Sequence, residues 1–424
     1  MNETVTAPTL STSGVQSSSP FYQGLLLRVF STLNQGQLRL ELPDGSVREF
    51  GRAGAAVSAR ITVRNPVFFQ KCVLFGDIGF GESYVDGDWE TDSIERVISW
   101  AIANVNHLPS MSGTKVRTLF FNILKGYNQV QHWLRPNSLA TSRRNISEHY
   151  DLGNEFYRLW LDPTLTYSSA RYTAPGQSLE AAQFAKYDAL CQKLRLHPGD
   201  HVLEIGSGWG GFSLHAAKNY GCRVTTITIS EEQFKLARQR FADAGLSDKI
   251  QILLQDYRLL TGSFDKIVSI EMMEALGDRY LETYLSKLNQ LLKPSGLIGL
   301  QFITVPDSRH AQLRKGVDWI QKHIFPGSLL LSLGRVSEAF SRTGDLTLHE
   351  LEDLGASYAK TLHVWWEQFN AKLDAVAALG FDGRFVRKWN YYLQYCEAAF
   401  ASRNISVVQG IYTRPNNSTL HTAY

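Results

Sequence analysis

Apolar and polar residues alternate along the first hundred residues with the period of a β-strand. The stretch "GQLRLELPDGSVREF" at 36–50 alternates from one residue to the next, which is typical of strands with one buried face. Asp44-Gly45 in its middle predicts a hairpin turn. A further strand is predicted in "ARITVRN" at 59–65. Residues 21–110 therefore predict a small α+β domain.

From about residue 145 onward, short apolar runs predict buried strands, and stretches with helical periodicity separate them. The strand candidates are "HVLEIG", "CRVTTITIS", "IQILLQD", "FDKIVSI" and "GLIGLQFI". A helix is predicted in "SEEQFKLARQRFADAG" at 230–245. Strands joined by helical crossovers predict an α/β fold with a parallel, doubly wound sheet over 145–424.

Two further segments differ from these domains in composition. Residues 1–20 are rich in Ser and Thr, and they lack the basic start and apolar centre of a signal peptide, so we expect a disordered tail. Residues 111–144 form a linker with six basic residues, no acid and interleaved apolar residues. Such a stretch can lie on an anionic membrane surface, or it can be an interdomain helix that packs on its neighbour.

Overall composition excludes several classes of protein. The 424 residues are enough for two or three domains, and the net charge of +3 does not indicate a nucleic-acid partner. No run of apolar residues is long enough to predict a membrane span. The four cysteines lie far apart, without the spacing of a metal site, which favours reduced thiols in a cytosolic protein and no bound metal.

A glycine-rich segment follows the first strand of the second domain. Its candidate cofactor-binding residues are Glu204, Gly206, Gly208, Gly210 and Gly211. Glycines at the carboxyl end of such a strand let the backbone approach a ligand closely. The spacing is GxGxG, whereas pyrophosphate loops have GxGxxG, and the preceding acid suits a cationic ligand. In this βαβ context the segment predicts binding of S-adenosylmethionine.

The next two strands also end in polar residues. The second ends at Thr228, and Ser230 with Gln233 reads either as a capping box or as part of a cofactor pocket. The third is followed by Asp256 and Tyr257, which could hold an adenine by a hydrogen bond and by stacking.

The fourth strand ends in two carboxylates. Glu271 and Glu274 in "SIEMMEALG" stand three residues apart where the strand should end. Acids at this position could be solvated, or they could face a reacting centre, and the pattern alone leaves both interpretations open.

Several long segments together resemble one enzyme family. They are "ISEHYDLGNEFYRLWLDPTLTYSSA", "VLEIGSGWGG", "TISEEQ", "LLQDYR", "WIQKHIFPG", "LGASYAKTL" and "YYLQYCEAAF". With them the chain resembles, from about 60 to 412, cyclopropane-fatty-acid synthases and mycolic-acid methyltransferases. The resemblance implies a Rossmann-like S-adenosylmethionine-dependent methyltransferase with a helical lid over an acyl pocket. It also implies that the N-terminal domain engages lipid.

The resemblance adds residues to both parts of the site. It implies that Tyr167 and Ser168 contact the cofactor and that His149 and Tyr150 fold over it. For catalysis it implies Glu274 and Tyr358, with Cys396 at a position matching a family cysteine.

The chain departs from the family's pattern around the anion. Family members hold a bicarbonate with a Cys, a Glu, a His and a Tyr, whereas this chain has Ser169 at the Cys position and Gln301 at the His position. Ser and Gln can donate hydrogen bonds to an anion, so bicarbonate stays open. Alternatively the carboxylate of Glu271 takes over part of the anion's work, because several relatives have a small residue at this position.

The activity implied is transfer of the S-adenosylmethionine methyl group to the double bond of an unsaturated acyl chain of membrane phospholipid, giving a cyclopropane fatty acid. Alternatives are a methylene- or methyl-branched product, a small-molecule N-methyltransferase, and a binding protein without catalysis. We expect a cytoplasmic enzyme on the inner, anionic face of the membrane. Self-association as a homodimer is a further expectation.

Overall fold

The computed structural model describes residues 19–105, 152–314 and 316–420. The chain divides into two compact units, Met1–Leu124 and Lys125–Tyr424. This boundary falls within the predicted linker 111–144, which itself lies outside the described residues. The first helix begins at Ser19, so the predicted tail 1–20 extends two residues too far.

The N-terminal unit is a mixed four-stranded sheet with helices. Its elements are α1 (Ser19–Phe30), β1 (Gln37–Glu41), β2 (Val47–Gly51), β3 (Ser58–Val63), α2 (Val67–Val85), β4 (Trp89–Glu90) and α3 (Ile94–Ala103). The strand order is β2-β1-β3-β4, with β1 antiparallel to β2 and parallel to β3. The predicted hairpin is confirmed, since Gly45 has φ +83° and Asp44 accepts a hydrogen bond from the Ser46 N–H.

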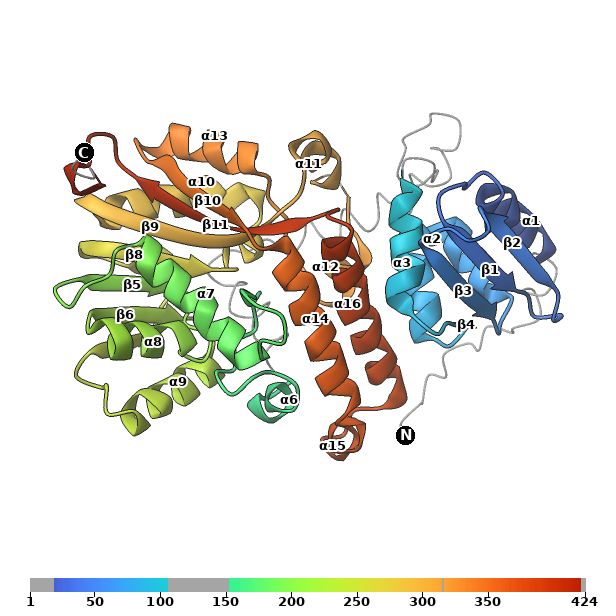
Figure 1. Cartoon of the computed structure of the whole chain (residues 1–424), viewed down its shortest axis with the longest axis horizontal. Coiled ribbons are helices and arrows are strands. Elements are labelled where there is room, and N and C mark those ends of the chain that lie inside the picture. Colours follow the sequence, from blue (N-terminus) through green and yellow to red (C-terminus); the bar gives the residue numbers. More distant parts are fainter. Residues whose placement is uncertain (1–18, 106–151, 315, 421–424) are drawn as a thin grey trace, which may run out of the picture. The chain divides into compact units, whose positions relative to one another are not determined.

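The C-terminal unit contains a seven-stranded sheet (Figure 1). Its strands are β5 (His201–Ile205), β6 (Arg223–Thr228), β7 (Ile250–Leu254), β8 (Phe264–Ile270), β9 (Leu292–Thr304), β10 (Thr347–Asp353) and β11 (Ser406–Thr413). Their order is β10-β11-β9-β8-β5-β6-β7. All five predicted strands are confirmed, and neighbours among them pair in parallel.

The prediction of a wholly parallel sheet is wrong at one edge. Strand β11 pairs antiparallel with β9, and β10 pairs antiparallel with β11. The outer strand β10 is almost entirely exposed, so its sequence lacks the apolar run that marks the buried strands.

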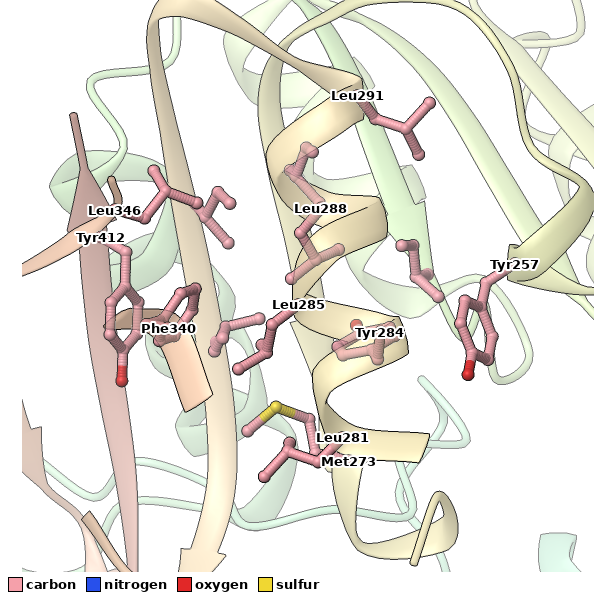
Figure 2. Packing of buried hydrophobic residues seen from close by; sticks show 14 of the residues in the cluster. Tyr257, Met273, Leu281, Tyr284, Leu285, Leu288, Leu291, Phe340, Leu346 and Tyr412 are labelled. Carbon is pink, nitrogen blue, oxygen red and sulfur yellow. The ribbon is translucent and has the colours of Figure 1, made fainter. Parts of the chain in front are cut away.

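Helices cover both faces of this sheet, as a doubly wound fold requires. On one face lie α7 (Leu179–Lys193), α8 (Gly211–Tyr220) and α9 (Glu231–Asp243), whose apolar residues pack on β5, β6 and β8. On the other lie α10 (Asp278–Leu291) and α13 (Leu333–Thr343). Figure 2 shows Leu281, Leu285 and Leu288 of α10 in the same cluster as Phe340 and Tyr412. These two cores hold the sheet rigid beneath its carboxyl edge.

The remaining helices are mostly additions to the doubly wound core. They are α6 (Asn154–Arg158), α11 (Asp307–Leu313), α12 (Trp319–His323), α14 (Gly355–Asn370), α15 (Leu373–Ala378) and α16 (Gly383–Ala401), with the short turns η3 (Tyr257–Leu259), η4 (Met273–Ala275) and η5 (Ser418–Leu420). Helices α14 and α16 lie side by side, joined through α15 (Figure 1). Fully buried Trp365 and almost fully buried Trp389 lie on this pair and build, with Trp160, an aromatic layer that matches the expected helical lid.

Candidate active site

The turn after β5, residues 206–211, is the glycine turn. Gly208 has φ +48°, and a side chain added there would meet no atom within 4 Å, so its backbone is bare on that side. A Cβ on Gly211 would instead lie 2.4 Å from the Tyr187 hydroxyl. The turn therefore needs glycine both for its conformation and for close packing. A bare backbone at the carboxyl end of β5 fits the cofactor predicted there.

Glu204, at the base of the glycine turn, is buried. Its Oε2 accepts hydrogen bonds from the hydroxyls of Ser213 in α8 (2.5 Å) and Thr226 in β6 (2.6 Å). Burial raises the pKa of Glu204 to about 7, against the lowering effect of these two bonds and of Lys186. Glu204 thus fastens the turn to its neighbours, and its predicted contact with the cofactor stays a prediction.

The residues after β6 form a buried hydrogen-bonded cap. Ser230 is the N-cap of α9, and its Oγ accepts a bond from the Gln233 N–H at 3.3 Å. The reciprocal half of the predicted capping box is wrong. The Ser230 N–H bonds to Thr228 Oγ1, and the Gln233 side chain accepts from that same hydroxyl at 2.8 Å. Thr228 and Gln233 are thereby held together at the end of β6, beside the glycine turn.

Asp256 and Tyr257 follow β7 and have protein partners. The Asp256 carboxylate accepts two bonds from the Arg258 side chain, at 2.8 and 2.7 Å. The Tyr257 ring packs edge-on against Tyr284, with centroids 5.1 Å apart. The buried Tyr257 hydroxyl has no hydrogen-bond partner among the described residues. The expected role of this pair at the adenine stays a prediction.

The turn after β8, residues 271–277, is the glutamate turn. Glu271 has φ +48°, a backbone conformation that residues other than glycine rarely adopt and that costs about 1–3 kcal/mol. Its backbone N–H donates to the Gln301 carbonyl at 2.7 Å. A side chain on Gly206 would lie 3.4 Å from Met272, so the glycine and glutamate turns are adjacent. The strained backbone aims the carboxylate inward.

Three donors from distant segments converge on the Glu271 carboxylate. Its Oε1 accepts from the Ser169 N–H at 2.8 Å and from Gln301 Nε2 at 2.7 Å. Its Oε2 accepts from the Tyr358 hydroxyl at 2.8 Å. Burial and the negative charge of Glu271 raise the pKa of Tyr358 well above its usual range, so the phenol stays a donor. The structure thus brings three predicted site residues together around the carboxylate of a fourth, Glu271.

A chain of amides fixes which atom of Gln301 faces this carboxylate. The Lys193 ammonium, which can only donate, bonds to Gln409 Oε1 at 2.9 Å. The Gln409 Nε2 then donates to Gln301 Oε1 at 3.0 Å. Only the Nε2 of Gln301 is left to face Glu271. The sequence analysis missed Gln409 and Lys193, because the contacts link residues more than a hundred positions apart.

Glu274, in η4, has a different environment from Glu271. Its Oε1 accepts one bond from the Ile303 N–H at 2.5 Å, and its buried Oε2 has no partner among the described residues. Burial and the nearby Glu271 charge raise the pKa of Glu274 to about 8. Burial also raises the pKa of Glu271, but the Gln301, Ser169 and Tyr358 bonds oppose it, as does Lys186. Near neutral pH the carboxyl of Glu274 is therefore mostly protonated.

The segment 167–169 lies between these turns and the aromatic layer. The Tyr167 hydroxyl lies 2.8 Å from that of Tyr392, and its ring packs against Trp160 and Trp365 with centroids 5.5 and 5.4 Å away. The hydroxyl of Ser168 accepts a bond from Lys186 Nζ at 2.8 Å. The segment is therefore rigid, as a cofactor-contacting stretch should be.

The other predicted residues have no structural support as catalytic groups. Burial raises the pKa of the Cys396 thiol in α16, so this sulfur is protonated and a poor nucleophile near neutral pH. Its role stays a prediction. His149 and Tyr150 lie outside the described residues.

Two wider features bear on the site. Within the described ranges, no group of His, Cys, Asp and Glu side chains could hold a metal ion. Nor does any helix described in the two units combine the length and apolar character needed to cross a membrane.

Comparisons with known proteins identify the family. The family model for mycolic acid cyclopropane synthetase matches residues 137–410. The tuberculostearic acid methyltransferase UfaA1 of Mycobacterium tuberculosis is 37% identical over 390 residues, which cover 88% of this chain and 86% of that protein. The cyclopropane-fatty-acyl-phospholipid synthase of Escherichia coli is 36% identical over 379 residues, covering 88% and 93%.

Solved structures show the same relationship. The mycolic acid cyclopropane synthase CmaA1, complexed with SAH and CTAB, is 31% identical to the chain. It covers 64% of this chain and 98% of its own, with a TM-score of 0.60. The chain belongs to the mycolic acid cyclopropane synthetase family of S-adenosylmethionine-dependent methyltransferases.

Proposed function

We propose that this enzyme transfers the methyl group of S-adenosylmethionine to the double bond of an unsaturated acyl chain of membrane phospholipid, giving a cyclopropane fatty acid. The observation that carries the proposal is the Glu271 carboxylate. It is held by three donors at the carboxyl edge of the sheet, next to the bare glycine turn. The name of the E. coli relative, a cyclopropane-fatty-acyl-phospholipid synthase, supports the substrate class.

The reaction needs a base and a stabiliser of positive charge. When bound, S-adenosylmethionine supplies a sulfonium methyl group that an alkene can attack, with breakage of the S–C bond and formation of a C–C bond. The alkene becomes a carbocation. Glu271 faces this charge and accepts a proton from the new methyl group, after which the C–H electron pair closes the ring. A buried carboxylate is well suited to both tasks because water does not screen it.

Bicarbonate does not fit this arrangement. The Ser169 N–H, Gln301 Nε2 and Tyr358 hydroxyl already bond to Glu271 at 2.7–2.8 Å. A bicarbonate in the same place would have to displace a side chain whose backbone is built to put it there. We therefore assign the role of the anion to Glu271, and the protonated Glu274 to a hydrogen-bonding role beside it.

Aromatic rings around the carboxylate provide a second source of charge stabilisation. The Tyr358 ring lies 4.4 Å, centroid to centroid, from Phe400 and 6.1 Å from Trp365. Tyr167 lies 5.4 Å from the same tryptophan. Faces of such rings attract cations by about 0.5–2 kcal/mol. They also exclude water, which would otherwise trap a carbocation.

The proposal includes the membrane. We propose that the linker 111–144, with its six basic residues, and the N-terminal domain bring the enzyme to the anionic inner face of the membrane, as a cytoplasmic peripheral protein. The enzyme would then bind the acyl chains of phospholipids at the membrane itself. A homodimer would double the number of such contacts.

The test is incubation of the full chain with S-adenosylmethionine and vesicles of unsaturated phosphatidylglycerol, followed by mass spectrometry of the fatty acids. We expect a gain of one CH2 with loss of the double bond. A gain of one CH2 with the double bond retained would show that the product is branched and that no ring is closed. No gain would overturn lipid methylation, and methylation of an amine substrate instead would favour a small-molecule N-methyltransferase. Cofactor binding with no product at all would indicate a binding protein.

A further inference from the structure

One lysine beside the two turns has no exposed surface. Lys186 in α7 is 0% exposed, and its Nζ donates to the Ser168 hydroxyl at 2.8 Å. The centroid of the Tyr187 ring lies 4.5 Å from Nζ. A buried ammonium group is costly unless charged partners face it.

The charges that face Lys186 are three carboxylates from separate segments. Burial lowers the pKa of the Lys186 ammonium to about 7, and the three carboxylates oppose this lowering, Glu271 most, followed by Asp162 and Glu204. Each of them has close partners of its own, since Asp162 accepts from the Thr164 N–H at 2.9 Å, Glu204 from two hydroxyls and Glu271 from three donors. In return, Lys186 lowers the pKa of both Glu204 and Glu271. Lys186, when charged, therefore acts on both the glycine turn and the glutamate turn.

Helix α7 also holds the segment that donates to Glu271. Gln183, three residues before Lys186 and on the same helix face, donates its Nε2 to the Ser168 carbonyl at 3.0 Å. Lys186 bonds to the hydroxyl of the same serine. The next residue, Ser169, donates its N–H to Glu271. The helix thus acts on the carboxylate twice, by position through 168–169 and by charge through Lys186.

We propose that Lys186 is a positioning residue of this methyl-transfer site, which fixes Ser168 and keeps the carboxylate of Glu271 charged for proton removal. This inference rests on the proposed function, because it assigns a charge state to the base named there. The other groups around Glu271 are Tyr358, which donates to it, and Glu274, which repels it. Lys186 is the buried cation in this set.

The test compares K186M and K186R with K266M in the full-length enzyme. Lys266 of β8 is also a buried lysine, but it faces Asp200 and Asp265, away from Glu271. In K186M we expect kcat on vesicles to fall at least tenfold near pH 7. We also expect the acidic limb of the kcat–pH profile to move to higher pH, because the carboxyl of Glu271 loses a cation that lowered its pKa. K186R should return the acidic limb to its wild-type pH, and K266M should not move the acidic limb.

An unmoved acidic limb in K186M, with or without a lower kcat, would overturn the proposal. If K186M does not fold, infrared spectroscopy of the wild type decides. The difference spectrum against E271Q should show an ionised Glu271 carboxylate at pH 7, and a protonated carboxyl band would overturn the assignment. Failure of the wild type to modify lipid, together with an ionised Glu271, would remove the proposed function and leave the charge role of Lys186 standing.

Discussion

The glycine turn and the glutamate turn follow neighbouring parallel strands, yet they are built in opposite ways. The glycine turn takes left-handed conformations with glycines, and its Glu204 bonds to nearby Ser213 and Thr226. The glutamate turn puts a carboxylate residue into the same left-handed region. Its Glu271 bonds to groups that are 30 to 102 positions away in sequence. The first turn is organised by local contacts, and the second holds a carboxylate on a strained backbone through distant ones.

The largest difference between the two turns should appear in kcat when the glutamate at each turn is replaced by glutamine. We expect E271Q to lower kcat on phospholipid vesicles by about 10²–10⁴, the usual contribution of a general base. Cofactor affinity, measured by calorimetry, should change little. E204Q is the matched control, because it should alter stability and cofactor affinity more than kcat. Equal losses of kcat in the two variants would show that the glutamate turn has no special chemical role.

A smaller effect should follow when the amide chain behind Glu271 is cut. In Q409L, Gln301 loses the donor to its Oε1, so its amide is free to turn away from the carboxylate. We expect kcat to fall about 3–10-fold, in line with a neutral hydrogen bond worth about 1 kcal/mol. S213A breaks a bond to Glu204 in the other turn and is the control. A turnover of Q409L equal to that of the wild type would mean that Gln301 needs no outside support.

The last comparison concerns the dependence of stability on pH. Burial raises the pKa of Glu274 from 4.5 to about 8 in the folded state, so the folded protein holds a proton that the unfolded chain has lost between these values. This contribution to stability is complete below pH 4.5 and is lost as the pH rises through 8. The slope reaches about 1.4 kcal/mol per pH unit for one proton.

The measurement is the free energy of unfolding of wild type and E274Q between pH 5 and 8. The variant should show a shallower decline, while Glu204, with a pKa near 7, keeps part of it. If the free energies of unfolding of the two proteins run parallel with pH, Glu274 does not hold this proton in the folded state.

The glycine turn was predictable from the sequence, and the glutamate turn only in part. Glycines and the Ser230 cap act through local geometry, which composition and spacing report directly. The pair Glu271 and Glu274 was visible, but their roles were not, because these depend on donors from β9, α14 and the segment before α7. The family resemblance implied a catalytic role for Glu274, whereas the converging donors lie on Glu271.

Lys186 and strand β10 were also not predicted, for similar reasons. Lys186 lies in α7, whose sequence shows no marked apolar face, and only its position three residues after Gln183 hinted at a shared buried face. The exposed edge strand β10 has no apolar pattern to detect. Contacts between residues far apart in sequence are the common element, and no single segment encodes them.

The central claim is that the Glu271 side chain replaces a bound bicarbonate. The most direct measurement is the rate of phospholipid modification in CO2-free buffer, with and without added bicarbonate, for the wild type and for E271G. We predict that the wild-type rate is the same in both buffers. E271G, whose glycine suits the left-handed backbone and opens room for an anion, should be nearly inactive and regain activity with bicarbonate. A wild-type rate that collapses without bicarbonate and returns when it is added would contradict the claim.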